Sequence, residues 1–490
     1  MFDKGLADYW EPPDTAASRE LLNDLAAAQR RENQACARRL RVVAELFGMR
    51  LAERGEKADW AVDTWAAVGA EVAAALRVSL GMAGSYLNYG LAMERLPAVA
   101  AAFDSGDIDM TVYRTVVYRT GLITDEAIMA QVDQILGARA ARWPSMTQGR
   151  LIREIDRVIA RLDPDAVRRL RDRVIDRDVT VWDGKEGIAE ISGLLFSTDA
   201  HLLDKRLDEL AKTVCEADPR TVAQRRADAL GALAAGAERL VCGCGAAACP
   251  ATAATPSPVV IHVVAEAATL EGRSDAPGYL LGADDLIPAE LLRDIAAAAK
   301  LRPLIDPGGR AAEPHYHPSR ALADFVRARD LTCRAPGCDR PATQCDLDHT
   351  IPYPRGATHA SNIKALCRLH HILKTFWGWR DRQLPDGTVI WNLPDGATYV
   401  TTPGSALLFP SLSVPTGPLP ASADHVSEAE SPHAAHRIAM MPTRTKTRRQ
   451  NRAHRIASER SRNREQRRTR YAACFGTAAP ADSTSDPPPF

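Results

Sequence analysis

The sequence lacks a run of about 18 uncharged apolar residues, the least that a membrane-spanning helix requires. Its N-terminus also lacks a basic segment followed by an apolar stretch, so we expect no secretory signal peptide. These two absences predict a cytoplasmic protein without a membrane partner.

An excess of charge is also missing, because 62 Lys and Arg residues balance 62 Asp and Glu residues. The charge is unevenly spread, since thirteen Lys and Arg residues stand against two Glu residues between Arg437 and Arg470. Hydrophobic residues at 46% and charged residues at 25% are the proportions of a soluble globular protein. A length of 490 residues is enough for several domains.

The ten cysteines do not suggest a disulfide framework. Seven of them fall into two groups with the short spacing of metal ligands. In a long chain this pattern favours a reducing compartment in which thiolates bind metals.

The first 300 residues predict a mainly α domain with a small β element. The segment 147–162 is the clearest helix, because its apolar residues form one stripe opposite Arg and acidic side chains. A β-hairpin is expected over 179–195 and a buried strand over 258–264. Further helices are predicted at 15–47, 61–77, 84–103, 110–120, 124–140, 199–215 and 222–240.

Three more segments follow this domain. Residues 301–320 form a Pro/Gly-rich linker, and residues 321–402 form a C-terminal module that contains the remaining motifs. Residues 403–490 are first rich in Pro and Ser and then rich in Arg, so we expect a disordered basic tail.

A cysteine-rich loop lies near the end of the helical domain. Cys242, Cys244 and Cys249 bring three thiols into eight residues. With a distant fourth ligand such as His262 they would hold a second zinc ion. The alternative is three free thiols in a loop.

Two knuckles in the C-terminal module have the spacing of zinc ligands. Cys333 and Cys338 flank a Pro-Gly turn, and Cys367 and His370 lie three residues apart at a predicted helix start. Together they predict one tetrahedral structural Zn²⁺. Cys345 has no second ligand at short spacing, so we interpret it as a packed strand residue.

The residues around the knuckles include polar side chains that a structural zinc site does not need. Asp348 and His349 end a predicted strand, Asn362 follows, and His371 comes directly after the second knuckle. Adjacent helix residues point about 100° apart, so His371 faces away from the zinc. Neighbours in a strand face opposite sides, so Asp348 and His349 can share a site only where the strand twists or ends.

This set of residues resembles the HNH endonuclease motif and its ββα-metal fold over about residues 325–390. The string from Cys333 to Thr375 is similar to that of the actinobacterial 13E12-repeat family. Proteins of that family join an N-terminal domain of unknown function (number 222 in its series) to a C-terminal HNH module. The N-terminal resemblance implies no activity.

The resemblance implies a role for each matching residue. His349 would be the general base that takes a proton from the attacking water. Asp348 and His371 would bind a catalytic Mg²⁺ or Mn²⁺ ion. Asn362 would fix the loop and orient the His349 ring, or assist the metal. DNA is the implied substrate, so the protein would be associated with the nucleoid when bound.

Basic residues near this motif are candidate phosphate contacts. The alternative for each is an ordinary solvated side chain, and the same choice holds for the Arg-rich tail. The candidates within the module are Arg355, Lys364, Lys374 and Arg380.

The sequence therefore predicts a metal-dependent DNA endonuclease. A second hypothesis is a catalytically silent, zinc-containing nucleic-acid-binding protein, which would not need the set Asp348, His349, Asn362 and His371. A third is that the helical domain is the functional part, as an interaction or regulatory unit. The oligomeric state is not determined by the sequence.

Overall fold

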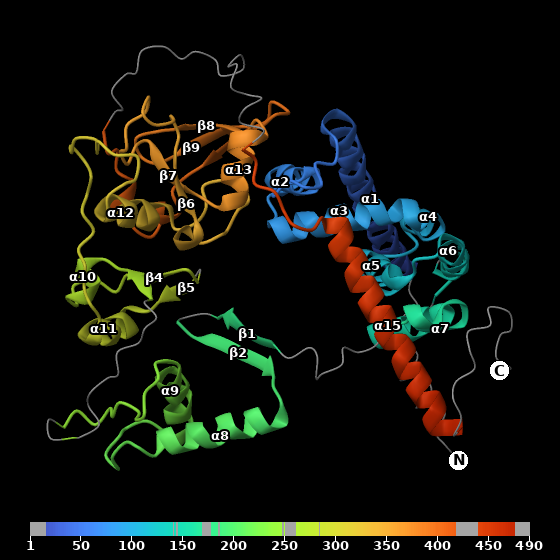
Figure 1. The fold of residues 1–490 in the computed structure, drawn as a ribbon, viewed down its shortest axis with the longest axis horizontal. Helices are drawn as coiled ribbons and strands as arrows, with labels where there is room; N and C mark the ends of the chain where they lie inside the picture. The colour runs from blue at the N-terminus through green and yellow to red at the C-terminus, as the bar shows by residue number, and fades with distance from the viewer. Residues whose placement is uncertain are drawn as a thin grey trace.

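The protein is described from a computed structural model (Figure 1). It describes residues 16–140, 142–143, 146–168, 178–184, 187–246, 249, 261–283, 285–417 and 440–475. The chain is mainly helical, with four small antiparallel sheets in these residues.

The N-terminal part is a bundle of helices around two hydrophobic clusters. Side-chain caps begin several of them, since Asp63, Ser79, Asp109 and Thr147 each accept a hydrogen bond from the first helical turn. The predicted stripe of the last helix is buried, which confirms that helix. The helices are α1 (Ala16–Arg54), α2 (Thr64–Leu76), α3 (Leu80–Arg95), α4 (Pro97–Asp104), α5 (Met110–Arg119), α6 (Glu126–Ala140) and α7 (Gln148–Leu162).

A β-hairpin and two helices follow, and then a three-stranded sheet. The hairpin of β1 (Asp178–Asp183) and β2 (Ala189–Leu194) confirms the predicted one. The strand predicted over 258–264 begins at His262, whose side chain is exposed, so it is buried only at Val264. Residues 258–260 lie outside the described residues. The other elements are α8 (Ser197–Ala211), α9 (Val222–Ala234), β3 (His262–Val264), α10 (Ala267–Leu270), β4 (Gly278–Leu281), β5 (Asp285–Ile287) and α11 (Ala289–Ala298).

The C-terminal module contains a ββα unit. Strands β6 and β7 pair antiparallel, with Asp348 opposite Lys364 and His349 opposite Ile363, and helix α13 follows directly. A three-stranded sheet in the order β10-β9-β8 packs beside this unit. The elements are α12 (Arg320–Asp330), β6 (Asp346–His349), β7 (Ile363–Leu366), α13 (Arg368–Phe376), β8 (Arg380–Gln383), β9 (Val389–Asn392) and β10 (Thr398–Thr401).

The helical bundle and the C-terminal module share a hydrophobic core. Val62 and alanines of α2 are buried in one cluster with the residues around the predicted zinc knuckles. Trp60 and Trp377 pack edge to face with ring centroids 5.7 Å apart. The indole nitrogen of Trp377 donates a hydrogen bond to the carbonyl oxygen of Val62 at 3.2 Å. The module is therefore fixed against the bundle.

The prediction of a disordered tail over 403–490 is wrong for the residues that the structure describes there. Residues 404–406 and 410–413 form short 3-10 helices, and α15 (Arg448–Phe475) runs along the N-terminal bundle (Figure 1). The helix lacks an apolar stripe, but acidic side chains of the bundle bind its arginines. Charge complementarity thus replaces the missing apolar face. Residues 418–439 and 476–490 lie outside the described residues.

Among the described residues, no single helix is long and apolar enough to cross a membrane. Helices α2 and α3 reach that length and apolarity only as a pair, which is bent by 110°.

Candidate functional site

The two predicted knuckles meet in one buried cluster. The ligand atoms of Cys333, Cys338, Cys367 and His370 all lie within 4.8 Å of one another. Cys367 Sγ lies 3.2 Å from His370 Nδ1 and 3.9 Å from Cys338 Sγ. Zinc–sulfur bonds of about 2.3 Å place tetrahedral sulfur ligands roughly 3.8 Å apart. The cluster can therefore hold a metal ion, and its donor set is that of a structural zinc site.

Local geometry explains why these four residues converge. Cys367 is the N-cap of α13, so His370 in the first turn faces the same side. The backbone N–H of Cys367 also donates to Cys333 Sγ at 3.3 Å. In the first knuckle, Gly337 has φ of +70°, and a Cβ there would lie 3.0 Å from the carbonyl oxygen of Ala73. Glycine thus allows both the turn and its contact with α2.

Cys345 is not a member of this cluster. Its side chain is buried, and its thiol donates to the carbonyl oxygen of Pro341 at 3.3 Å. It lies directly before β6, as a packed residue.

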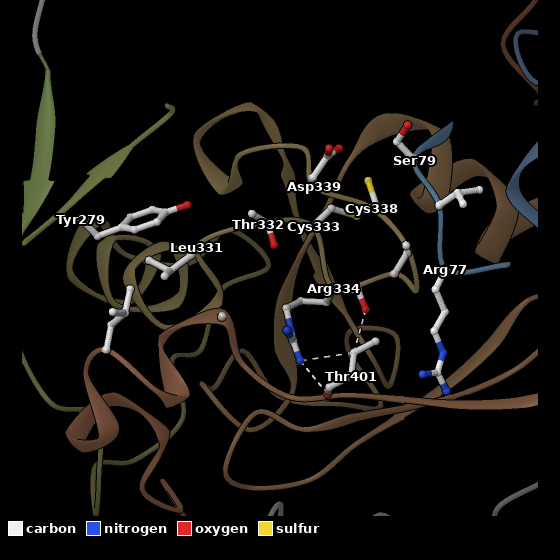
Figure 2. Close-up of a pocket in the computed structure, with 15 residues that line it drawn as sticks. Arg77, Ser79, Tyr279, Leu331, Thr332, Cys333, Arg334, Cys338, Asp339 and Thr401 are labelled. Carbon is white, nitrogen blue, oxygen red and sulfur yellow. Dashed lines mark hydrogen bonds between the residues drawn. The ribbon is translucent and has the colours of Figure 1, made fainter. Parts of the chain in front are cut away.

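A surface pocket of 520 Å³ lies beside the first knuckle (Figure 2). The segment between α2 and α3 forms one wall, and residues 331–339 form another. Arg334 in this pocket donates to the carbonyl oxygen of Thr401 at 2.7 Å. Its guanidinium therefore connects the first knuckle to strand β10. The predicted catalytic residues do not line this pocket, which is therefore distinct from the predicted catalytic site.

A second cluster contains four thiols. Cys242, Cys244 and Cys249 lie with Cys215, and their sulfur atoms are within 4.8 Å of one another. Cys215, not His262, is therefore the fourth residue of this group. The Cys215 and Cys242 sulfurs are 3.5 Å apart. This group can also hold a metal ion, and four thiolates are a donor set that Zn²⁺ favours.

Hydrogen bonds on both sides of the thiols fix this second cluster. Thr213 Oγ1 accepts from the Leu240 N–H at 2.8 Å, and Asp218 accepts from the Gly243 N–H at 2.8 Å. The two segments that carry the thiols are therefore held together by the protein itself.

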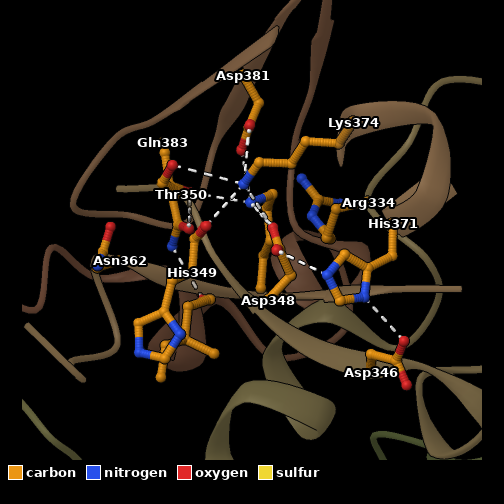
Figure 3. A network of polar contacts seen from close by, with 12 residues as sticks. Arg334, Asp346, Asp348, His349, Thr350, Asn362, His371, Lys374, Asp381 and Gln383 are labelled. Atoms are coloured by element: carbon orange, nitrogen blue, oxygen red, sulfur yellow. Dashed lines mark hydrogen bonds and ion pairs between the residues drawn. The ribbon is translucent and has the colours of Figure 1, made fainter. Parts of the chain in front are cut away.

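The predicted catalytic residues gather at the end of β6 (Figure 3). Asp348 and His349 face opposite sides of the strand, as regular alternation requires. Asp348 faces the side with Lys364, Lys374 and His371, while the ring of His349 faces the other side. The strand ends at His349.

Two lysines neutralise the Asp348 carboxylate. Its Oδ2 atom lies 2.7 Å from the ammonium nitrogens of both Lys364 and Lys374. Asp381 binds the same two ammonium groups, at 2.5 Å and 3.1 Å. Burial alone would raise the pKa of Asp348, but the two lysines outweigh it and hold that pKa well below its usual range.

This cluster changes the predicted role of the two lysines. The side chain of Lys364 is fully buried, and that of Lys374 is 15% exposed. Both bind Asp348 and Asp381, so the prediction that they contact phosphate is wrong for Lys364, which no ligand can reach. Lys374 is also committed within the protein, and it donates to the carbonyl oxygen of His349 at 2.6 Å. Arg355 and Arg380 have exposed side chains, as a phosphate contact requires.

A chain of two hydrogen bonds defines the protonation of the His349 ring. Its Nε2 atom lies 2.9 Å from Thr358 Oγ1, and the Thr358 hydroxyl donates to the carbonyl oxygen of His315. Because that hydroxyl proton is already used, the Thr358 oxygen must accept a proton from His349 Nε2. The neutral ring therefore carries its proton on Nε2, which leaves a lone pair on Nδ1.

The surroundings of His349 also favour the neutral ring. Burial lowers the pKa of His349 below its usual value, and Asp348 only partly opposes this shift. Tyr316 stacks on the ring with centroids 5.3 Å apart, and Tyr353 lies at 6.2 Å. The imidazole is thus held between aromatic neighbours in the form that can accept a proton.

Asn362 fixes the loop that follows β6, as predicted. Its Oδ1 accepts from the Ile351 N–H at 2.8 Å, and its Nδ2 donates to the carbonyl oxygens of Ile351 and Ala357. It makes no hydrogen bond to His349 among the described residues, so the expectation that it orients that ring is wrong. Thr358 orients the ring instead.

His371 points toward Asp348 from the first turns of α13. Its Nδ1 lies 2.9 Å from Asp346 Oδ2, which orients the ring, and its Nε2 lies 3.5 Å from Asp348 Oδ1. Adjacent ligands of an octahedral Mg²⁺ ion are about 3 Å apart. The free oxygen of Asp348 and Nε2 of His371 could therefore hold one divalent cation between them.

Sequence reasoning missed several members of this site, among them Asp346, Tyr316, His315 and Thr358. Asp346 lies two residues before Asp348 and so on the same face of the strand, which is a usable signal. Tyr316 and His315 lie in the predicted linker, and Thr358 lies in a loop. Nothing local in the sequence marks these three, because they reach His349 only after the chain has folded.

The comparisons with known proteins place the chain among relatives. The family described as "Domain of unknown function (DUF222)" matches residues 27–330, which extends past the predicted domain boundary at residue 300. The uncharacterized protein Rv3776 of Mycobacterium tuberculosis is 45% identical over 492 residues, covering 94% of this chain and 93% of that protein. The uncharacterized protein Rv2100 of the same organism is 43% identical over 508 residues, covering 94% and 91%. No solved structure matches the chain. The chain belongs to the DUF222 family.

Proposed function

We propose that the protein is a metal-dependent endonuclease of the HNH type that hydrolyses phosphodiester bonds of DNA. The observation that carries the proposal is the hydrogen-bonded chain from His349 through Thr358 to the His315 carbonyl. That chain prepares one ring nitrogen as a base, and a binding module would have no need of it.

In the proposed reaction, His349 Nδ1 takes a proton from a water molecule. The water oxygen then forms a bond to phosphorus as the bond to the leaving oxygen breaks, and the leaving oxygen takes up a proton from solvent. A neutral imidazole with a pKa below 6.5 is unprotonated at neutral pH and can act as such a base. Tyr316, Tyr353 and Thr358 keep the ring in place during this step.

The proposal also includes a divalent cation. Asp348 Oδ1 and His371 Nε2, 3.5 Å apart, would hold Mg²⁺ or Mn²⁺. Such an ion stabilises the negative charge that develops on the leaving oxygen. Asp346 orients His371 through its Nδ1 atom, so the other ring nitrogen points toward the cation position.

The second candidate is a catalytically silent, zinc-containing nucleic-acid-binding protein. One observation favours it: both Lys364 and Lys374 already neutralise Asp348. A carboxylate with two ammonium partners attracts a divalent cation less strongly than a free one.

The test is the conversion of supercoiled plasmid by the full chain with Mg²⁺, Mn²⁺ or no added metal. We expect metal-dependent nicking that His349→Ala abolishes. His201→Ala, which removes an exposed histidine of α8, is the matched control and should nick like the unchanged protein. Equal nicking by His349→Ala would refute the assignment of the base. DNA binding without nicking under any metal would support the second candidate.

A further inference from the structure

Seven arginines of helix α15 fall into two sets. The first set binds acidic side chains of the N-terminal bundle and fixes the helix against it. Its ion pairs are Arg448 with Asp63 at 2.7 Å, Arg460 with Asp163 at 2.6 Å, and Asp165 with Arg464 at 3.0 Å and Arg467 at 2.7 Å.

The second set faces a cavity and has no acidic partner. Arg452, Arg455 and Arg462 are exposed, and they line a cavity of 680 Å³ between α15 and residues of α3 and α5. Arg95, the last residue of α3, lines the same cavity from the opposite wall. In the described part of the chain, none of these four guanidinium groups has a hydrogen bond or an ion pair.

The charge in this cavity is strongly positive. Five arginines line it, and its single acidic residue is Glu459. Arg168, the fifth arginine, already binds Glu459 at 3.1 Å. The lining residues therefore leave four positive charges without compensation.

Arg95 is half-buried, and burial raises the free energy of its charged form. Burial lowers the pKa of this guanidinium, and the nearby charge of Arg452 lowers it further. Like charges that face one cavity repel each other, and an anion between them would remove that repulsion. Guanidinium groups bind phosphate oxygens through paired hydrogen bonds, so phosphate is the anion that best fits this lining.

The spacing along the helix favours a polymer over a single phosphate. Arg455 and Arg462 are two turns apart on one face, which corresponds to about 10.5 Å along the helix axis. Guanidinium groups that extend in parallel from these two positions keep this separation, so they would contact successive phosphates of a nucleic-acid strand. Arg468 and Arg470, farther along the helix, are also exposed but do not line the cavity.

We propose that the cavity formed by Arg95, Arg452, Arg455 and Arg462 binds phosphate groups of a DNA strand. It would be a second DNA contact, formed by the helical bundle and its C-terminal helix and separate from the residues around His349. The choice of DNA as the polyanion rests on the proposed function, but binding here requires no cleavage.

The test measures affinity and its salt dependence with a fluorescent DNA duplex, in the His349→Ala background without added divalent metal. Each phosphate contact contributes about 0.9 to the slope of log affinity against log salt. The double variant Arg455→Gln/Arg462→Gln should bind more weakly and lower the slope by about two. Arg468→Gln/Arg470→Gln removes the same charge from the same helix outside the cavity and should leave the slope unchanged. Equal losses in both double variants would overturn the proposal.

Arg95→Gln tests the opposite wall of the cavity. It lies outside the C-terminal helix, so a weaker affinity here supports the cavity, and an unchanged affinity refutes it. Arg95→Lys keeps the charge and should retain more affinity than Arg95→Gln, while thermal unfolding of each variant checks that the bundle is intact.

Calorimetry with inorganic pyrophosphate separates a small-anion site from a DNA contact. Tight pyrophosphate binding that Arg95→Gln removes, with unchanged DNA affinity, would overturn the assignment to DNA. Absence of nicking would refute the nuclease proposal, whereas unchanged DNA affinity in the cavity variants would refute this one. DNA binding through the cavity without nicking would therefore support this proposal while refuting the other.

Discussion

The Nε2 atom of His349 lies 2.9 Å from the hydroxyl oxygen of Thr358, whose own proton is donated to the carbonyl of His315. This relationship sets both the direction of the ring and the nitrogen that carries the proton. It also means that a loop threonine would control the proposed base without taking part in the reaction itself.

Thr358→Val removes the acceptor while it keeps the shape of the side chain. We expect the rate of DNA cleavage to fall by roughly one to two orders of magnitude, part of the 10²–10⁴-fold contribution of a general base. Thr358→Ser retains the hydroxyl and should stay within a few-fold of the unchanged protein. The measurement is single-turnover cleavage, with circular dichroism to confirm folding. An undiminished rate in the valine variant would show that the hydroxyl does not orient the base.

The pH profile of cleavage should report the His349 ring. Burial disfavours the charged ring, so its pKa lies below 6.5 and the base is active only above that pKa. The rate should rise with pH through a value below 6.5 and then level off. Because the pKa of His349 is lower in the folded protein than in the unfolded chain, the unfolded chain binds this proton more readily. The free energy of unfolding should therefore fall as the pH drops through 6.5. An acid limb centred above 6.5 would contradict the assignment.

Lys364→Met should destabilise the C-terminal module. The variant leaves Asp348 and Asp381 as neighbouring buried carboxylates without one of their cations. Loss of one partner of a buried ion pair costs about 3–5 kcal/mol. Urea unfolding measures this change. Arg380→Gln, at an exposed position of β8, should change stability by only about 0.5 kcal/mol. A Lys364→Met protein of normal stability but reduced DNA affinity would restore the phosphate role for Lys364.

Elemental analysis should find two zinc ions per chain. Cys333→Ser and Cys215→Ser should each lose one ion, while Cys345→Ser should retain both, because Cys345 belongs to neither cluster. Loss of the first ion should unfold the ββα unit, since structural zinc supplies about 10–16 kcal/mol of apparent binding energy. A single zinc in the unchanged protein, retained by Cys215→Ser, would exclude the second site.

Short-range spacing was sufficient to predict much of the molecule. Cys333, Cys338, Cys367 and His370 form the expected cluster, because a turn and one helical turn determine where their ligand atoms point. The helices with strong apolar periodicity were predicted for the same local reason. The strand that ends at His349 also follows from the residues around it.

Contacts between distant segments explain the rest. Cys215 joins its cluster from 27 residues before Cys242, and no local pattern identifies it. A lysine in a sequence is usually interpreted as a surface residue. Lys364 is instead buried, because it forms an ion pair with Asp348 on the neighbouring strand. Helix α15 has no apolar stripe, and the carboxylates that bind it lie between 297 and 385 residues earlier in the chain.

The ion pairs between α15 and the bundle have a consequence for synthesis. Asp163 and Asp165 leave the ribosome long before their partners Arg460 and Arg464 exist. At about 5–20 residues per second, this interval is roughly 15–60 s. The C-terminal module is completed within it, so the first domain acquires its last helix only after the second domain has been made. A chain that ends before Arg448 would contain a complete C-terminal module but an N-terminal bundle without its last helix.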